Sequence, residues 1–88
     1  MWGWSEGADP STVYMQSMGQ RPNHATRHVL NFMRAKQQMP LNMLLWDAGD
    51  ENTQKIAYRA VTELVAGNKL SLSPDGASIS LHHDVRAE

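Results

Sequence analysis

The sequence predicts a small α+β domain in which three helices precede a β-hairpin. Apolar residues recur with helical spacing between residues 24 and 66, and a Gly-Asn pair follows the longest of these stretches. Near the end of the chain, two segments of alternating apolar and polar residues flank a Pro-Asp-Gly turn. At 88 residues the chain has room for one core, but not for a core and an enclosed catalytic cleft. One module is therefore expected, over residues 23–83.

Residues 1–22 are predicted to form a flexible or docking N-terminal arm. They mix Gly, Ser, Pro and Gln and show no sustained period of 3.6 or 2. Trp2, Trp4 and Tyr14 stand out, because mobile tails are usually poor in large apolar side chains. Three roles are open for these aromatics: docking on the chain's own core or on a second copy, binding a foreign protein, or none.

The first helix is expected over about residues 24–38. Asn23 or Thr26 can cap its start, and the apolar residues of the VLNFM segment follow with helical spacing. Pro40 forbids continuation, because proline has no backbone N–H and its ring clashes with the preceding turn.

A second helix of about two turns is expected in the segment NMLLWDAG. Asn42 can cap it, Gly49 can end it, and its leucines can point inward. Trp46 is interpreted as a half-buried packing residue in preference to a platform for stacking.

The third helix is the most strongly indicated element. Asn52 is the best placed of several capping residues that precede it. Its apolar residues cover one side of a helix at about 100° per residue: Ile56, Ala57, Ala60, Val61, Leu64 and Val65. Gly67 and Asn68 supply its end.

A β-hairpin is expected next, because LSLS and SISL alternate apolar with polar residues on either side of a PDGA turn. Its core face is predicted to carry Leu70, Leu72, Ile79 and Leu81. The last residues, 84–88, are expected to fray.

This order of helix, short helix, turn, long helix ending in Gly, and hairpin resembles the winged helix-turn-helix domains. The segment TQKIAYRAVTELVAGNKLSLSPDGASISL is similar to the recognition helix, the following strand and the wing of such domains in bacterial regulators. The resemblance covers residues 23–83 and implies a three-helix winged helix-turn-helix domain with a C-terminal β-hairpin wing. It also implies double-stranded DNA as the partner, usually bound by a homodimer.

Residues on the outer face of the third helix suit a DNA duplex. Lys55, Tyr58, Arg59 and Thr62 lie opposite the apolar face, with Gln54 at its border. Arg59 could fork onto a guanine edge or a phosphate, Gln54 could pair with adenine, and Thr62 could touch a thymine methyl. Lys55 and Tyr58 could hold backbone oxygens. An ordinary solvated helix face carries similar residues.

Charge is unevenly distributed along the chain. The net charge is −1, but residues 21–62 sum to +3 and the segments on either side are each −2. Arg27 and Arg34, seven residues apart, share one side of the first helix and could contact flanking phosphates. They could equally form an ordinary charged surface.

Neither catalysis nor a cofactor is expected. The chain has no cysteine, no GXSXG elbow and no phosphate-binding or dinucleotide-binding glycine motif. His24 and His28 have the i, i+4 spacing of a metal pair, with His82 or His83 as further ligands, but ordinary surface histidines are the preferred interpretation. No apolar run long enough for a membrane span and no secretion signal is seen, so a cytoplasmic protein is expected.

The function predicted is sequence-specific binding of double-stranded DNA by a small bacterial or phage transcriptional regulator that acts as a dimer. The alternative is a winged-helix protein-protein interaction module, for instance a phage-encoded inhibitor of a host complex, that does not bind DNA. The acidic turn of Asp47, Asp50 and Glu51 and a wing tip without Arg or Lys favour this alternative. Deletion of residues 1–20 is expected to separate the two.

Overall fold

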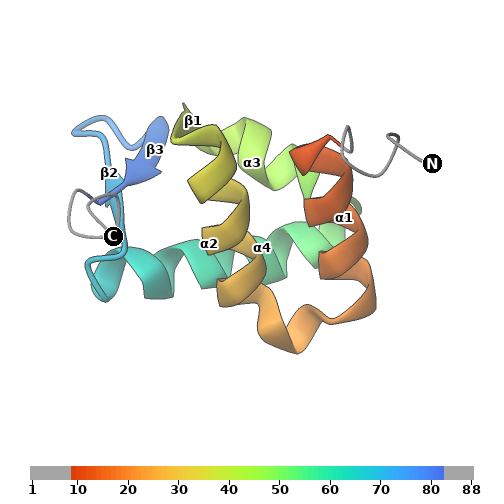
Figure 1. The fold of residues 1–88 in the computed structure, drawn as a ribbon. Coiled ribbons are helices and arrows are strands. Elements are labelled where there is room, and N and C mark those ends of the chain that lie inside the picture. Colours follow the sequence, from red (N-terminus) through yellow and green to blue (C-terminus); the bar gives the residue numbers. More distant parts are fainter. Residues whose placement is uncertain (1–8, 83–88) are drawn as a thin grey trace.

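Helices make up most of the molecule, whose computed structural model describes residues 9–82. Four α-helices and the short 3₁₀ helix η1 accompany a three-stranded antiparallel sheet, which makes a small α+β domain (Figure 1). In this view α2 crosses α4, and α3 and β1 lie along the upper side. The elements are α1 (Pro10–Gln20), η1 (Pro22–His24), α2 (Ala25–Lys36), β1 (Gln38–Pro40), α3 (Leu41–Asp47), α4 (Glu51–Ala66), β2 (Leu70–Leu72) and β3 (Ser78–Leu81).

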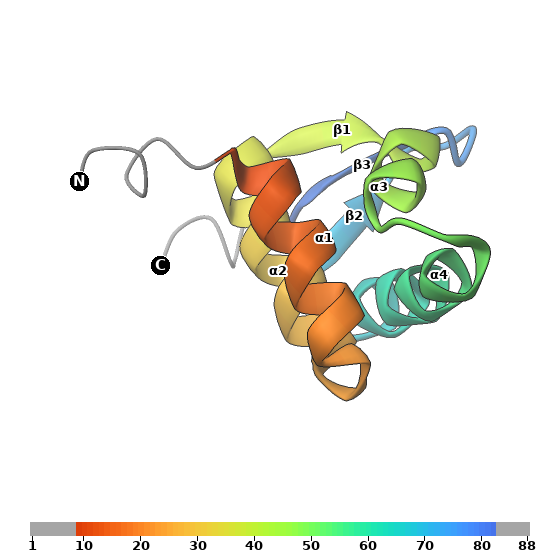
Figure 2. The same ribbon diagram turned by 90° about the vertical axis from the view of Figure 1, so that its right-hand side faces the viewer.

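The arm predicted over residues 1–22 is helical over residues 10–20. The Asp9 side chain accepts a hydrogen bond from the backbone N–H of Ser11 (3.1 Å), and Pro10 occupies the first helical position, where it loses no hydrogen bond. α1 runs beside α2 (Figure 2). Only two of its residues, Tyr14 and Met18, are buried, and this pair one turn apart was too sparse a pattern to reveal a helix.

Tyr14 is part of the core, so its assignment to a partner-binding site was wrong. Its side chain is 2% exposed, and its ring stacks on Phe32 with a centroid distance of 4.3 Å and an interplanar angle of 11°. Of the roles left open for the arm aromatics, docking on the chain's own core is the one found for Tyr14. Trp2 and Trp4 lie outside the described residues, as do His83 and residues 84–88.

The sheet has the strand order β1-β3-β2, with every pair antiparallel. The hairpin of β2 and β3 confirms the prediction, whereas β1 was not foreseen. Gln37 adopts a φ of 71° and ends α2 two residues earlier than predicted, so that the next three residues can pair with β3. The backbone N–H of Leu41 then donates to the carbonyl of Ala77 (2.9 Å). A three-residue strand is too short to show alternation in the sequence.

Two helix caps differ from the predictions. α3 begins at Leu41, before the expected cap Asn42. α4 is capped by Asp50 in place of Asn52, because the Asp50 carboxylate accepts from the backbone N–H (2.9 Å) and the hydroxyl (2.6 Å) of Thr53. Gly67 ends α4 as predicted.

Two apolar side chains are more exposed than predicted. Trp46 is 71% exposed, because it lies on the outer side of α3. Leu72 is 44% exposed although it faces the same way as Leu70, since β2 is an edge strand and its end lies beside the turn. Ile79, its partner on the central strand, is buried.

The core joins the four described α-helices to the sheet and buries no charged side chain among the described residues. Its buried members are Tyr14, Met18, Ala25, Val29, Phe32, Met33, Leu44, Ala48, Ala57, Ala60, Val61, Leu64, Leu70, Ile79 and Leu81. The Tyr14 hydroxyl is buried without a hydrogen-bond partner in the described part of the chain. Burial, with a smaller effect from the charge of Asp47, raises the pKa of Tyr14 above its usual range.

We expect Tyr14→Phe to raise the free energy of unfolding by about 1 kcal/mol, because it removes a buried hydroxyl that has lost its hydrogen bonds to water. Tyr14→Ala should lower it by roughly 3 kcal/mol, because it leaves a cavity beside Phe32. Urea unfolding followed by circular dichroism measures both. A Tyr14→Ala variant as stable as the wild type would show that α1 is not part of the core.

Candidate nucleic-acid interface

The outer face of α4 carries four of the residues predicted to bind DNA. Lys55, Tyr58, Arg59 and Thr62 are all exposed, as the helical spacing indicated. Tyr58, at 55% exposed, is the only large apolar side chain among them. The Thr62 hydroxyl donates to the carbonyl of Tyr58 one turn earlier (3.0 Å). Lys55 lies 3.8 Å from Glu51 in an exposed ion pair, which holds it weakly.

Gln54, the fifth predicted residue on this helix, has a different environment. Its side chain is half-buried, and its amide Nε2 donates to the carbonyl of Gly49 (3.0 Å). Gly49 has a φ of 118°, a conformation that glycine adopts without strain. Gln54 therefore holds the turn between α3 and α4, and one N–H of its amide is committed to that contact.

A groove lies along the junction of α2 and α4, and we call it the α2–α4 groove. It consists of two hollows that share Thr26. The larger, of about 730 Å³, is lined by Pro22, Asn23, Ala25, Thr26, Lys55, Ile56, Arg59, Ala60 and Glu63. The smaller, of about 400 Å³, is lined by Thr26, Arg27, Leu30, Asn31, Arg34, Leu64 and Lys69. Arg27 and Arg34 thus line the smaller hollow, and the cations of α4, Lys55 and Arg59, line the larger one beside it.

Positive charge is concentrated along this groove. Of the seven Lys and Arg residues between positions 9 and 82, five line it: Arg27, Arg34, Lys55, Arg59 and Lys69. Of the six Asp and Glu residues in the same range, Glu63 alone lines it, although Glu51 lies nearby through its ion pair with Lys55. All five cationic side chains are exposed, so they are available to a ligand with several negative charges.

Lys69 is the member of this set that sequence reasoning missed. It follows the Gly67-Asn68 stop of α4, and Asn68 has a φ of 62°. The backbone N–H of Lys69 donates to the carbonyl of Leu64 (2.8 Å), which directs the chain back beside α2. Its position directly after a helix end was visible in the sequence, but its neighbours on α2 were not.

The acidic residues outside the groove are engaged in local structure. Hydrogen bonds from Thr53 hold the pKa of Asp50 below its usual range. In the hairpin turn, Asp75 accepts from the Ser73 hydroxyl (2.5 Å) and the Ala77 N–H (3.0 Å), which lowers its pKa likewise. The Ser11 hydroxyl donates to Asp47 (3.4 Å). Asp50 thus caps α4, Asp75 stabilises the hairpin turn, and Asp47 contacts α1.

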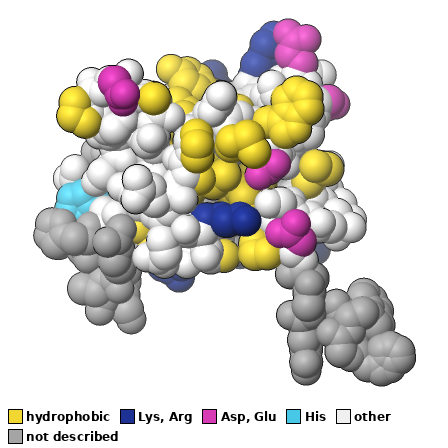
Figure 3. All heavy atoms as spheres, turned by 90° about the horizontal axis from the view of Figure 1, so that it is seen from above, with side chains coloured by type: hydrophobic (Ala, Val, Ile, Leu, Met, Phe, Trp, Pro, Cys, Tyr) yellow, Lys and Arg dark blue, Asp and Glu magenta, His cyan; other side chains and the backbone are white. Residues whose placement is uncertain are grey.

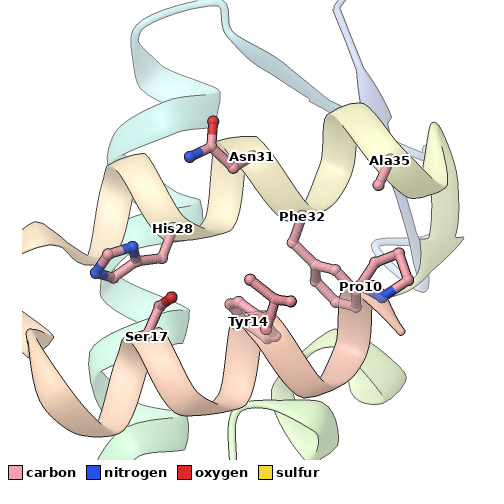
Figure 4. Close-up of a pocket in the computed structure, with 8 residues that line it drawn as sticks. Pro10, Tyr14, Ser17, His28, Asn31, Phe32 and Ala35 are labelled. Carbon is pink, nitrogen blue, oxygen red and sulfur yellow. The ribbon is translucent and has the colours of Figure 1, made fainter. Parts of the chain in front are cut away.

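A third hollow, of about 260 Å³, lies between α1 and α2 (Figure 4). Ser17 and His28 both line it, but the His28 ring nitrogen Nε2 lies 3.0 Å from the carbonyl of Arg21. The residues described as lining it include no carboxylate, so Ser17 and His28 do not form a catalytic triad there.

The histidines of the first predicted helix lie near each other, with 6.3 Å between the ring centroids of His24 and His28. Within residues 9–82, no three His, Asp or Glu side chains are grouped as metal ligands. None of the described helices is both long and apolar enough to cross a membrane.

No family model, no curated protein and no solved structure matches this chain.

Asp50→Ala is expected to lower the melting temperature at pH 7 by about 5 °C, because α4 loses its N-cap. The Asp50 pKa is lowered in the folded state, so its stabilisation is present above the unfolded pKa of 3.8 and is lost as pH falls through the folded value. The difference from the wild type should therefore shrink towards pH 2. Asp50→Asn, which caps without titrating, is the control and should differ little from the wild type at pH 7.

Proposed function

We propose that this chain is a winged helix-turn-helix protein that binds double-stranded DNA through α4 and the α2–α4 groove. The order of elements supports the fold assignment: a helix, a short helix, a long helix ending in Gly67 and a hairpin are all present, with α1 added in front and β1 joined to the sheet. α3 and α4 correspond to the helix-turn-helix, and β2 with β3 to the wing.

The observation that carries the DNA proposal is the collection of five cations in one groove beside the exposed face of α4. The duplex backbone is a dense line of negative charge, and Lys and Arg contacts to it supply most of the non-specific affinity of DNA-binding proteins. A chain with a net charge of −1 gains no such attraction from its overall charge. The attraction has to come from a local surface, and the α2–α4 groove provides it.

The proposed DNA-binding surface makes two kinds of contact, one with base edges and one with phosphates. Arg59, Tyr58 and Thr62 project from α4, where they can reach base edges in a major groove. Arg27, Arg34 and Lys69 are better placed to hold phosphates beside it, which fixes position without reading sequence. The wing carries Asp75 and has no cation between residues 70 and 81, so it is not assigned a phosphate contact.

The biological role proposed is that of a small transcriptional regulator acting in the cytoplasm. A single helix-turn-helix module reads only a short stretch of base pairs, and two-fold dimers extend the site to two half-sites. We therefore propose a homodimer on a two-fold symmetric operator.

Binding to random duplex DNA should weaken steeply with salt. Phosphate contacts by four cations, Arg27, Arg34, Lys55 and Lys69, predict a slope of log K against log salt of about −3.6, and Lys69→Ala should reduce its steepness by about 1. Lys36→Ala is the matched control: it removes the same charge from an exposed residue of α2 outside the groove, and it should leave the slope unchanged. Fluorescence anisotropy across a salt series measures all three proteins.

Equal effects of the two substitutions would mean that only net charge matters, and would contradict a defined interface. Absence of binding at low salt would remove the DNA proposal. If binding is found, selection from a randomised duplex library identifies the operator, and Arg59→Ala should then relax base preference at one position.

The second candidate is a protein-protein interaction module, and the 71% exposure of Trp46 favours it. The deletion of residues 1–20 no longer separates the two candidates, because it would remove the buried Tyr14 and Met18 and unfold the domain. Deletion of residues 1–8 is the usable version, since it keeps the Asp9 cap of α1. We expect DNA binding to survive this deletion, whereas a protein partner held by Trp2 and Trp4 would be lost.

A further inference from the structure

An apolar surface lies on the outer side of α3. Trp46 is 71% and Met43 47% exposed, and Met15 of α1, 46% exposed, lies beside Gly49, three residues after Trp46. Leu41 and Leu45 of α3 are only partly buried. Figure 3, which views the molecule from above, shows hydrophobic side chains gathered across the centre of the face that carries α3 and β1, with acidic and basic side chains beside them. We call this surface the α3 face.

A shallow hollow of about 550 Å³ lies between α3 and the turn that precedes β3. It is lined by Pro40, Leu41, Asn42, Leu45, Gly76, Ala77 and Ser78. None of these described lining residues is charged, and the leucines and proline make its floor apolar. Asn42 precedes Trp46 by four residues on α3, so the two side chains are neighbours on the same side of the helix. A projecting indole and an apolar hollow therefore stand side by side.

We propose that the α3 face is the contact between two copies of this chain, in which Trp46 of each copy enters the hollow of the other. A projection next to a matching hollow is self-complementary, because a two-fold axis between them places each projection over the opposite hollow. The pair buries both indoles and fills both hollows by one symmetric contact. A segment that only filled the hollow would leave Trp46 in water.

Charge also favours a second copy as the occupant. The hollow lacks charged lining residues, and a net charge of −1 per chain gives little repulsion between copies. The five cations of the α2–α4 groove do not line this hollow, so pairing here leaves them free for DNA. The contact thus supplies the dimer of the proposed regulator, although it does not depend on DNA binding.

The size of the surface indicates a weak dimer. A fully buried aromatic side chain covers about 150–250 Å², and Trp46 with the two methionines and the hollow gives roughly 500 Å² per copy. Such an area is at the low end for specific pairs, so we expect a Kd on the order of 10–100 μM.

Sedimentation equilibrium of the full chain from about 5 to about 500 μM tests the pairing. The mean mass should rise from 9.9 kDa towards about twice that value. Trp46→Ala, which removes the projection, and Ala77→Glu, which places a charge in the hollow, should each weaken association at least about tenfold. Both positions are at the surface, so the core is undisturbed. Tyr58→Ala, an exposed aromatic on α4, is the control and should pair like the wild type.

Mixing the two variants adds a sharper test. Trp46→Ala keeps its hollow and Ala77→Glu keeps its indole, so a mixed pair regains one of the two contacts. The mixture should associate more than either variant alone. A nonspecific apolar contact would show no such recovery, and that result would overturn the proposal.

Other outcomes would also overturn it. A wild-type chain that stays at 9.9 kDa throughout, or a Trp46→Ala variant that pairs normally, excludes the proposed contact. Deletion of residues 1–8 should leave pairing unchanged. If the deletion abolishes pairing, the arm supplies the contact, and if it creates pairing, the arm covers the α3 face. Lys69→Ala should not change the mass, which keeps this test separate from the DNA experiment.

Discussion

The close approach of α4 to α2 is the contact on which the rest of the structure depends. α2 packs against α4, and Ala57 and Ala60 of α4 are buried to within 1% exposure in the same core as Val29 and Met33 of α2, which are fully buried. Small side chains at such a crossing let two helix backbones come near each other, so a groove forms along the line where their outer residues diverge. That groove holds the cations. A larger residue at Ala57 or Ala60 would separate the two helices and so move the cations of the groove apart.

The parts of the fold that were predictable from sequence are those whose pattern is local and long. α4 has 16 residues with an apolar side repeated over four turns, a capping group before it and a glycine after it. The hairpin is marked by alternation and a Pro-Asp-Gly turn. α1 shows the opposite case, because two buried residues in an otherwise polar helix carry little signal and only packing on α2 makes the helix stable. β1 depends on pairing with residues 38 to 42 positions further along the chain.

The same division applies to the candidate site. The exposure of Lys55, Tyr58, Arg59 and Thr62 follows from spacing along one helix, so a helical wheel found it. The groove could not be found that way, because it joins α2, α4 and the residue after α4. Gln54 shows the converse, since its place at the border of the apolar face suggested a residue that pairs with adenine, whereas its amide holds Gly49. The spacing of residues along a helix predicts which side of the helix a side chain lies on, but it does not predict which residue of another element the side chain contacts.

The shortness of the outer strands has a consequence for the behaviour of the chain at high concentration. β1 and β2 are each three residues long, and β1 ends in Pro40, which cannot donate a ladder hydrogen bond. An incoming strand would therefore find few backbone groups to pair with, and the sheet resists growth from chain to chain. At high concentration the molecules can therefore associate only through side-chain contacts, which are reversible. We expect concentrated solutions of this protein to form no fibrils, although each molecule exposes a tryptophan.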